Sequence, residues 1–139
     1  MNAERLLKLA DFLAQVPADQ FNMSAWQYDA PSKPETETLG ECGFAGCAVG
    51  WAVHAKLFDG LTFVESWPGG PRSLMPVFDG AKNWSAVSRL FDLPNGPDYD
   101  EPSNEAEHLF MGGRYPRRPK PSDVAERIRT FVKNNGQIT

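Results

Sequence analysis

The sequence predicts a mostly α-helical protein: a single compact domain of four to five helices, compatible with one short β-hairpin near residues 62–78. Two observations support this fold class. Apolar residues recur at helical spacing in most of the segments that lie between proline and glycine clusters. Segments that resemble strands are short and few. The length of 139 residues suits one domain, which we assign to residues 1–139.

The first predicted helix covers residues 3–16. Asn2 is a suitable N-cap, because its side chain can accept a hydrogen bond from a free backbone N–H at the helix start. Pro17 ends the helix, because a proline disfavours helical geometry in the residue before it. The apolar stripe of this helix consists of Leu6, Leu9, Ala10, Leu13 and Val16.

Two irregular segments precede the second predicted helix. Residues 21–28 are hydrophobic without a clear period, and we expect a turn or a short helix that packs on the core. Residues 29–40 are polar and contain prolines, which predicts a mobile loop. The second helix is predicted over about 43–58 and is closed by Asp59 and Gly60.

The predicted hairpin pairs residues 62–64 with residues 75–78 around Gly69 and Gly70. Pro76 has no backbone N–H for a sheet, so we expect its strand to lie at an edge. Three further helices are predicted over about 81–92, 103–111 and 123–134. Ser103 and Ser122 are the expected N-caps of the last two.

Charge is segregated in the last third of the chain. Six acids and no base lie between Asp92 and Glu107, whereas seven bases and two acids follow from Arg114 onward. We expect these two groups to neutralise each other within one fold. The segment 114–121 is both basic and proline-rich, and we interpret it as a rigid strap that leads to the last helix with Tyr115 anchored in the core.

The composition narrows the functional classes. The net charge of −4 gives no reason to expect nucleic acid as a default partner. Two cysteines are too few for a disulfide scaffold, so we expect a reducing, cytoplasmic location. We see no signal peptide, and the apolar run 44–58 is shorter than a bilayer span. No motif for a cofactor is found, and we expect none to be bound.

The segment 42–55 contains both cysteines and one of the two histidines. Gly43, Cys47, Gly50 and His54 would share one stripe of the predicted helix, with Gly46 close by, and three helical glycines indicate close packing against another element.

A thiol nucleophile is the chemical alternative. Cys47 or Cys42 would then need His108 as its base, because His54 would lie about 10 Å from Cys47 along the helix axis.

A metal site is a weaker alternative. Cys42, Cys47, His54 and His108 provide the four ligands of a Cys₂His₂ set. Zinc ligands usually come in pairs two to four residues apart, and this spacing fits that pattern poorly. We therefore predict no metal.

The basic strap offers an interaction surface through Arg114, Arg117, Arg118 and Lys120. An unidentified protein is the partner that we expect. Weak binding of nucleic acid phosphates through the same side chains is the alternative.

The sequence also resembles a family of small uncharacterised bacterial and phage proteins. The resemblance rests on Trp26 followed by Cys42-Gly43-x-x-x-Cys47-Ala48-x-Gly50-Trp51-Ala52, and on the later runs Ala86-x-x-x-Leu90-Phe91-Asp92-Leu93 and Glu105-Ala106-x-x-Leu109-Phe110. It covers about half of the chain. Phe44 departs from the threonine of the family pattern, which removes a hydroxyl partner for a thiolate. The resemblance implies a compact helical domain from bacteria or their viruses, and no activity for any residue.

Together, these observations predict a non-enzymatic accessory protein that acts as a protein-interaction module. The alternatives are a cysteine-dependent hydrolase or transferase that uses Cys47 or Cys42 with His108, and weak nucleic-acid binding through the basic segment near the C-terminus. The oligomeric state does not follow from the sequence.

Overall fold

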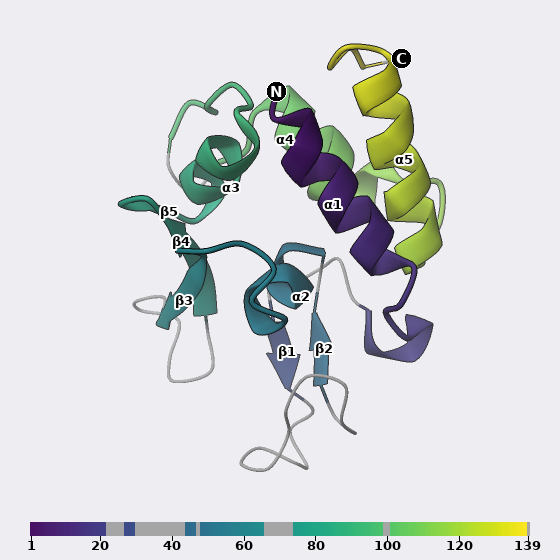
Figure 1. Cartoon of the computed structure of the whole chain (residues 1–139), viewed down its shortest axis with the longest axis horizontal. Coiled ribbons are helices and arrows are strands. Elements are labelled where there is room, and N and C mark those ends of the chain that lie inside the picture. Colours follow the sequence, from purple (N-terminus) through teal and green to yellow (C-terminus); the bar gives the residue numbers. More distant parts are fainter. Residues whose placement is uncertain (22–26, 30–43, 47, 66–73, 99–100, 139) are drawn as a thin grey trace.

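The computed structural model describes residues 1–21, 27–29, 44–46, 48–65, 74–98 and 101–138. Within these ranges the chain forms five α-helices and five short strands, and the strands form one two-stranded and one three-stranded antiparallel sheet (Figure 1). The predicted helices and the predicted hairpin are both found. The fold is nevertheless mixed α/β rather than purely helical, since it contains three strands that the sequence pattern did not reveal.

Helices α1 (Ala3–Leu13) and α5 (Pro121–Lys133) lie side by side and antiparallel, although they are the first and last helices of the chain (Figure 1). The Asn2 side chain accepts a hydrogen bond of 3.0 Å from the backbone N–H of Arg5, as its predicted role as N-cap requires. Helix α1 ends at Leu13, three residues earlier than predicted. A short 3₁₀ helix, η1 (Ala18–Gln20), follows Pro17.

Helix α5 begins earlier than predicted. Ser122 is not its N-cap, because Pro121 already occupies the first helical position, where its missing N–H costs nothing. The Asp123 carboxylate instead accepts a hydrogen bond of 2.8 Å from the backbone N–H of Lys120, the N-cap residue. The helix ends at Lys133, and Asn135 and Gly136 follow with φ values of +56° and +81°, so Gly136 lies beyond the helix end as expected.

Helix α4 (Asn104–Phe110) crosses behind α1 in Figure 1 and packs against α5. Its predicted N-cap is confirmed, since the hydroxyl of Ser103 accepts a hydrogen bond of 3.2 Å from the N–H of Ala106. A short 3₁₀ helix, η2 (Gly112–Arg114), follows it directly and turns the chain back towards α5.

Residues 44–58 do not form one helix. Phe44–Gly46 is strand β2, which pairs with β1 (Gln27–Asp29), and α2 covers only Ala48–His54. Lys56 has a φ of +54°, a left-handed conformation that ends helical geometry soon after His54. The helix predicted over 43–58 was too long at both ends, because an apolar run cannot show that part of it pairs with a distant segment.

Strands β3 (Thr62–Glu65) and β4 (Leu74–Phe78) form the predicted antiparallel hairpin. The expected edge position of Pro76 was wrong, because the two-residue strand β5 (Ala81–Lys82) pairs with the other side of β4. Proline is tolerated there because β5 pairs only with Val77 and Phe78. The carbonyl of Pro76 accepts a hydrogen bond of 2.8 Å from the N–H of Asn83, which follows β5. Pro76 therefore lies beyond the paired part of β5, where its lack of an N–H breaks no sheet hydrogen bond.

Helix α3 (Trp84–Phe91) is shorter than the helix predicted over 81–92, since its first residues form β5 and a turn. Asn83 has a φ of +57° immediately before the helix, and Asp92 has a φ of +51° immediately after it. Asp92 is in the left-handed helical region, which Asp adopts more readily than most residues and which ends the helix, whereas Asn83 has a ψ of −133° and lies outside that region.

One hydrophobic cluster joins all five helices. Phe91 lies within it: its ring stacks on Phe110 at a centroid distance of 5.4 Å and meets the edge of Phe58 at 5.9 Å. Ser88 is buried beside this cluster, and its hydroxyl donates a hydrogen bond of 2.9 Å to the carbonyl of Pro94. Among the described residues, no buried side-chain polar atom lacks a hydrogen-bond partner.

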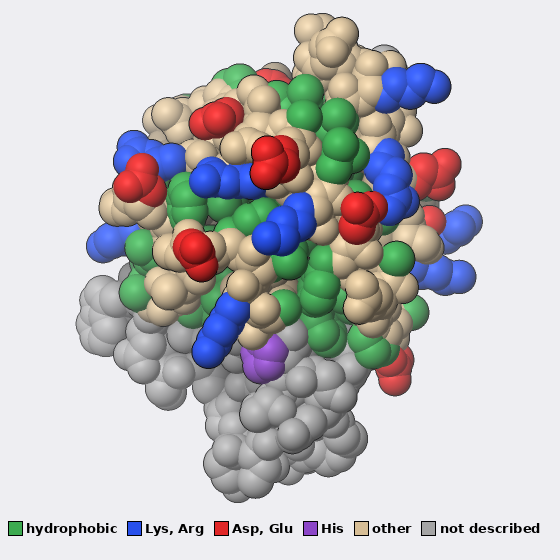
Figure 2. Space-filling model, viewed as in Figure 1, with side chains coloured by type: hydrophobic (Ala, Val, Ile, Leu, Met, Phe, Trp, Pro, Cys, Tyr) green, Lys and Arg blue, Asp and Glu red, His purple; other side chains and the backbone are tan. Residues whose placement is uncertain are grey.

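Charges of both signs are interspersed on the face that α1 and α5 share (Figure 2). One exposed pair there joins Arg129 of α5 to Asp11 of α1 at 3.0 Å. None of the helices in the described ranges is both long enough and apolar enough to cross a membrane.

Candidate binding site

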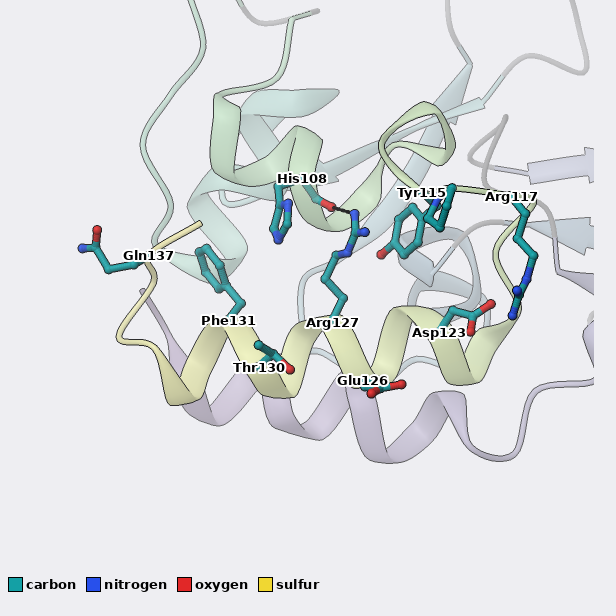
Figure 3. Close-up of a pocket in the computed structure, with 10 residues that line it drawn as sticks. His108, Tyr115, Arg117, Asp123, Glu126, Arg127, Thr130, Phe131 and Gln137 are labelled. Carbon is teal, nitrogen blue, oxygen red and sulfur yellow. Dashed lines mark hydrogen bonds between the residues drawn. The ribbon is translucent and has the colours of Figure 1, made fainter. Parts of the chain in front are cut away.

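An open pocket of about 340 Å³ lies between α4, the segment that follows η2, and α5 (Figure 3). Its lining combines charged and polar side chains with aromatic ones. The lining residues are His108, Tyr115, Pro116, Arg117, Asp123, Glu126, Arg127, Thr130, Phe131 and Gln137. The basic strap predicted at 114–121 therefore forms one wall of a pocket.

Arg127 is the central side chain of this pocket. It projects from α5 towards α4, and its Nη1 donates hydrogen bonds of 2.9 Å to the carbonyl of His108 and 2.8 Å to the carbonyl of Arg114. Its guanidinium also lies over the ring of Tyr115, 3.7 Å from the centroid. One cation thus holds together α4, η2 and the start of the strap.

These contacts satisfy the carbonyl groups at the C-terminal end of α4. A helix leaves its last carbonyls without partners inside the helix. The carbonyl of His108 accepts from Arg127, and that of Leu109 accepts a hydrogen bond of 2.8 Å from the Tyr115 hydroxyl. The positive charge of Arg127 also interacts favourably with the negative end of the helix dipole. The predicted anchoring of Tyr115 is confirmed.

The electrostatics of the pocket favour a neutral imidazole at His108. Partial burial lowers the pKa of His108 below its ordinary value of 6.5, and the charges of Arg127 and Arg114 lower it further. Burial also raises the pKa of the Tyr115 hydroxyl, so the phenol stays protonated and continues to donate to Leu109.

We expect the protein to lose stability as the pH falls below about 6.5. The pKa of His108 is lower in the folded state than in the unfolded state, so the unfolded chain binds more protons in this range. The neutral imidazole of His108 therefore contributes its full share of stability above about pH 6.5. This contribution is lost as the pH falls through the pKa that His108 has in the folded protein. Urea unfolding at several pH values measures this slope. His108→Gln should have a shallower slope, and a slope equal to that of the unchanged protein would contradict the assignment.

The four predicted interaction residues do not behave alike. Arg114 is engaged, because its Nε donates a hydrogen bond of 2.7 Å to Glu107. Arg117, Arg118 and Lys120 are exposed, and their side chains form no ion pair or hydrogen bond within the described ranges. Among the described residues, the expected neutralisation of the basic tail by the acidic block is thus found for Arg114 only.

The thiol and metal hypotheses rest largely on residues outside the described ranges, since these do not include Cys42, Cys47 or Gly43. His54 lies at the end of α2, and His108 lies in the pocket on α4. No three His, Cys, Asp or Glu side chains among the described residues are grouped to hold a metal. Of the predicted stripe, Gly50 and His54 both lie on α2, whereas Gly43 and Cys47 are outside the described ranges. Gly46, which was expected close to the stripe on the same helix, is instead in β2.

Arg127 was not predicted as a site residue and was counted only as part of the basic tail. Its position on the predicted helix could have indicated its role. At 100° per residue, Arg127 falls beside the buried stripe of Val124, Ile128 and Phe131, so its cation must lie at the edge of the core. Such a position favours contacts with neighbouring backbone and aromatic groups over full hydration.

Comparison of the chain with models of protein families, with curated proteins and with solved structures found no match in any of the three. The family resemblance carried by the Cys42–Ala52 motif therefore stays a prediction.

Proposed function

We propose that this protein is a non-enzymatic accessory module that binds an acidic segment of a partner protein through its basic strap and the adjoining pocket. One observation carries this proposal. Three exposed cations lie within four residues of the strap: Arg117, Arg118 and Lys120. None of them forms an ion pair with a carboxylate of the described residues. Uncompensated charges of one sign on a fixed backbone favour a partner of the opposite sign.

The backbone of the strap is held in place at both ends, which supports a binding role. At its start, Tyr115 is fixed by its hydrogen bond to Leu109 and by the stacked Arg127. At its end, Pro119 and Pro121 are buried, and Asp123 accepts a hydrogen bond from the N–H of Lys120. A segment that is already ordered loses little conformational entropy when a partner binds.

Most other arginines in the described ranges have acceptors within the fold, which makes the strap distinctive. Arg5 donates to the carbonyl of Leu90, Arg89 to the carbonyl of Asp79, and Arg129 to Asp11. These side chains contribute to packing between elements. The three strap cations make no such contact, so they are the ones that a partner can engage at low desolvation cost.

We expect the triple variant Arg117→Ala/Arg118→Ala/Lys120→Ala to bind acidic peptide about tenfold more weakly, since each exposed ion pair contributes roughly 0.5 kcal/mol. The probe is a fluorescent 20-residue poly-glutamate, and the measurement is anisotropy at low and moderate salt. Affinity should fall with rising salt, because exposed charges are screened.

The matched control removes three positive charges elsewhere, with Lys8→Ala/Lys82→Ala/Lys133→Ala at exposed positions of α1, β5 and α5. It has the same net charge as the test variant and should retain most of the affinity. Equal loss in both variants would show a general charge effect and contradict a dedicated surface. Binding of a 20-nucleotide oligonucleotide through the strap, without binding of the acidic peptide, would replace the proposal by the nucleic-acid alternative.

A further inference from the structure

The pocket in Figure 3 has two chemically different ends. Arg127 and His108 face the same space at one end, where Thr130 also lies on α5. Arg117 and Asp123 lie together at the other end, beside the strap. The first end thus contains a cation and neutral donors, whereas the second contains charges of both signs.

Arg127 has donors that the fold leaves unused. A guanidinium carries five N–H donors, and Nη1 directs its two at the carbonyls of His108 and Arg114. Within the described part of the chain, no acceptor pairs with the three donors on Nε and Nη2, and the imidazole of His108 has no hydrogen-bond partner there either. These groups line the pocket and are available to a ligand.

Arg127 also forms no ion pair with a carboxylate of the described residues. Arg114, Arg89 and Arg129 each form an ion pair with an acidic side chain, whereas within the described ranges Arg127 bonds to two carbonyl groups and stacks on an aromatic ring. Its positive field reaches His108 and disfavours protonation of the imidazole. A carboxylate placed against its free donors would form the ion pair that Arg127 lacks.

We propose that the Arg127–His108 end of the pocket binds one carboxylate group of the acidic partner. The free donors of Arg127 hold its oxygens, an N–H of His108 donates to one of them, and the Thr130 hydroxyl is a further donor. This deepens the proposed function and rests on it. The strap cations attract the acidic segment, and the pocket selects one of its carboxylates.

A carboxylate fits this pocket better than a phosphate does. Asp123 and Glu126 line the same cavity as Arg127 and Arg117, so the four charges of the lining cancel. The two acids repel an anion while the two arginines attract it, so a dianion gains no net electrostatic advantage over a monoanion from this lining, although it loses more hydration on binding. The carboxylate can belong to a glutamate or aspartate side chain or to a chain terminus, and the chemistry of recognition is the same for both.

The test is an NMR titration of the two histidines in the unmodified protein. The probes are an acetylated and amidated hexapeptide with one glutamate, the same peptide with glutamine, the glutamine peptide with a free C-terminal carboxylate, and inorganic phosphate. Each is added to about 10 mM, because a single-carboxylate contact is expected to have a millimolar dissociation constant. The imidazole resonances are followed from about pH 4.5 to 8.5.

We expect the glutamate peptide to raise the pKa of His108 by about one unit, because the bound carboxylate offsets the fields of Arg127 and Arg114. Glu107, which is bonded to Arg114, is present in both states and does not produce this change. His54 is the internal control: its pKa is also lowered by burial, but it lies on α2 outside the pocket and should not respond.

A second variant keeps the test independent of folding defects. Arg127→Lys retains the positive charge but not the planar guanidinium group. It should weaken binding of the glutamate peptide at least fivefold. Unchanged His54 signals show that the variant is folded.

The outcomes separate the two proposals. Equal responses of His108 to the glutamate and glutamine peptides would overturn the carboxylate site, as would a larger response to phosphate than to either carboxylate probe. If His108 fails to respond while the strap variant still loses poly-glutamate binding, the proposed function stands without this site. A His108 response with no effect of the strap variant supports the carboxylate site and refutes the binding role of the strap.

Discussion

Replacing Phe91 by alanine is expected to lower the free energy of unfolding by about 4 kcal/mol, within the range for deletion of a buried aromatic ring. Phe91 has no exposed surface and lies at the point where α3, α4 and the segment after α2 meet. The substitution removes the stacking contact with Phe110 and the edge contact with Phe58 at the same time. The cavity that remains cannot close without moving two helices.

Urea unfolding followed by circular dichroism measures this loss. Leu7→Ala is a suitable control, because Leu7 lies on α1 with 37% of its surface exposed and should change stability by less than about 0.5 kcal/mol. A loss of less than about 2 kcal/mol for Phe91→Ala would contradict the assignment of the three phenylalanines to one tightly packed cluster.

Replacing Arg127 by alanine is expected to cost about 2–3 kcal/mol, a large effect for a side chain that is only partly buried. Two carbonyl groups lose a charged donor, and the Tyr115 ring loses the cation stacked on it. The strap loses one of the contacts that fix its start. Binding of the glutamate peptide should become undetectable at about 10 mM.

A second readout separates the electrostatic role of Arg127 from a general loss of structure. Removing its charge should raise the pKa of His108 towards 6.5, because one of the two cations that depress it is gone. Arg129→Ala is the matched control on the same helix. It breaks one exposed pair with Asp11, should cost less than about 0.5 kcal/mol, and should leave His108 unchanged.

Local sequence signals predicted the helices best where caps and apolar stripes agree. Ser103 and Asn2 act as predicted, because an N-cap needs only its own helix. The helix predicted over 43–58 was wrong in extent because part of that segment depends on a distant one. Its apolar run contains residues 44–46, which pair with residues 27–29 across an intervening segment, and no spacing rule within the run shows such pairing.

The candidate site was predicted in composition but not in arrangement. The sequence identified the strap cations, His108 and the anchoring of Tyr115. It gave no reason to connect Arg127 with the C-terminal end of α4, because that contact spans 19 residues and depends on how two helices cross. It also grouped Arg114 with the free cations, although Glu107 neutralises it.

The sequence by itself determined the elements whose causes are local: caps, helix ends at glycine and proline, the apolar faces and the basic strap. The tertiary structure alone decided which charges stay uncompensated, because this depends on which carbonyl or carboxylate group lies within reach of each cation. Arg127 became the centre of a pocket because α4 presents its free carbonyls to α5. Arg117, Arg118 and Lys120 remained available because no described carboxylate forms an ion pair with their side chains, although Asp123 lies near Arg117 (Figure 3).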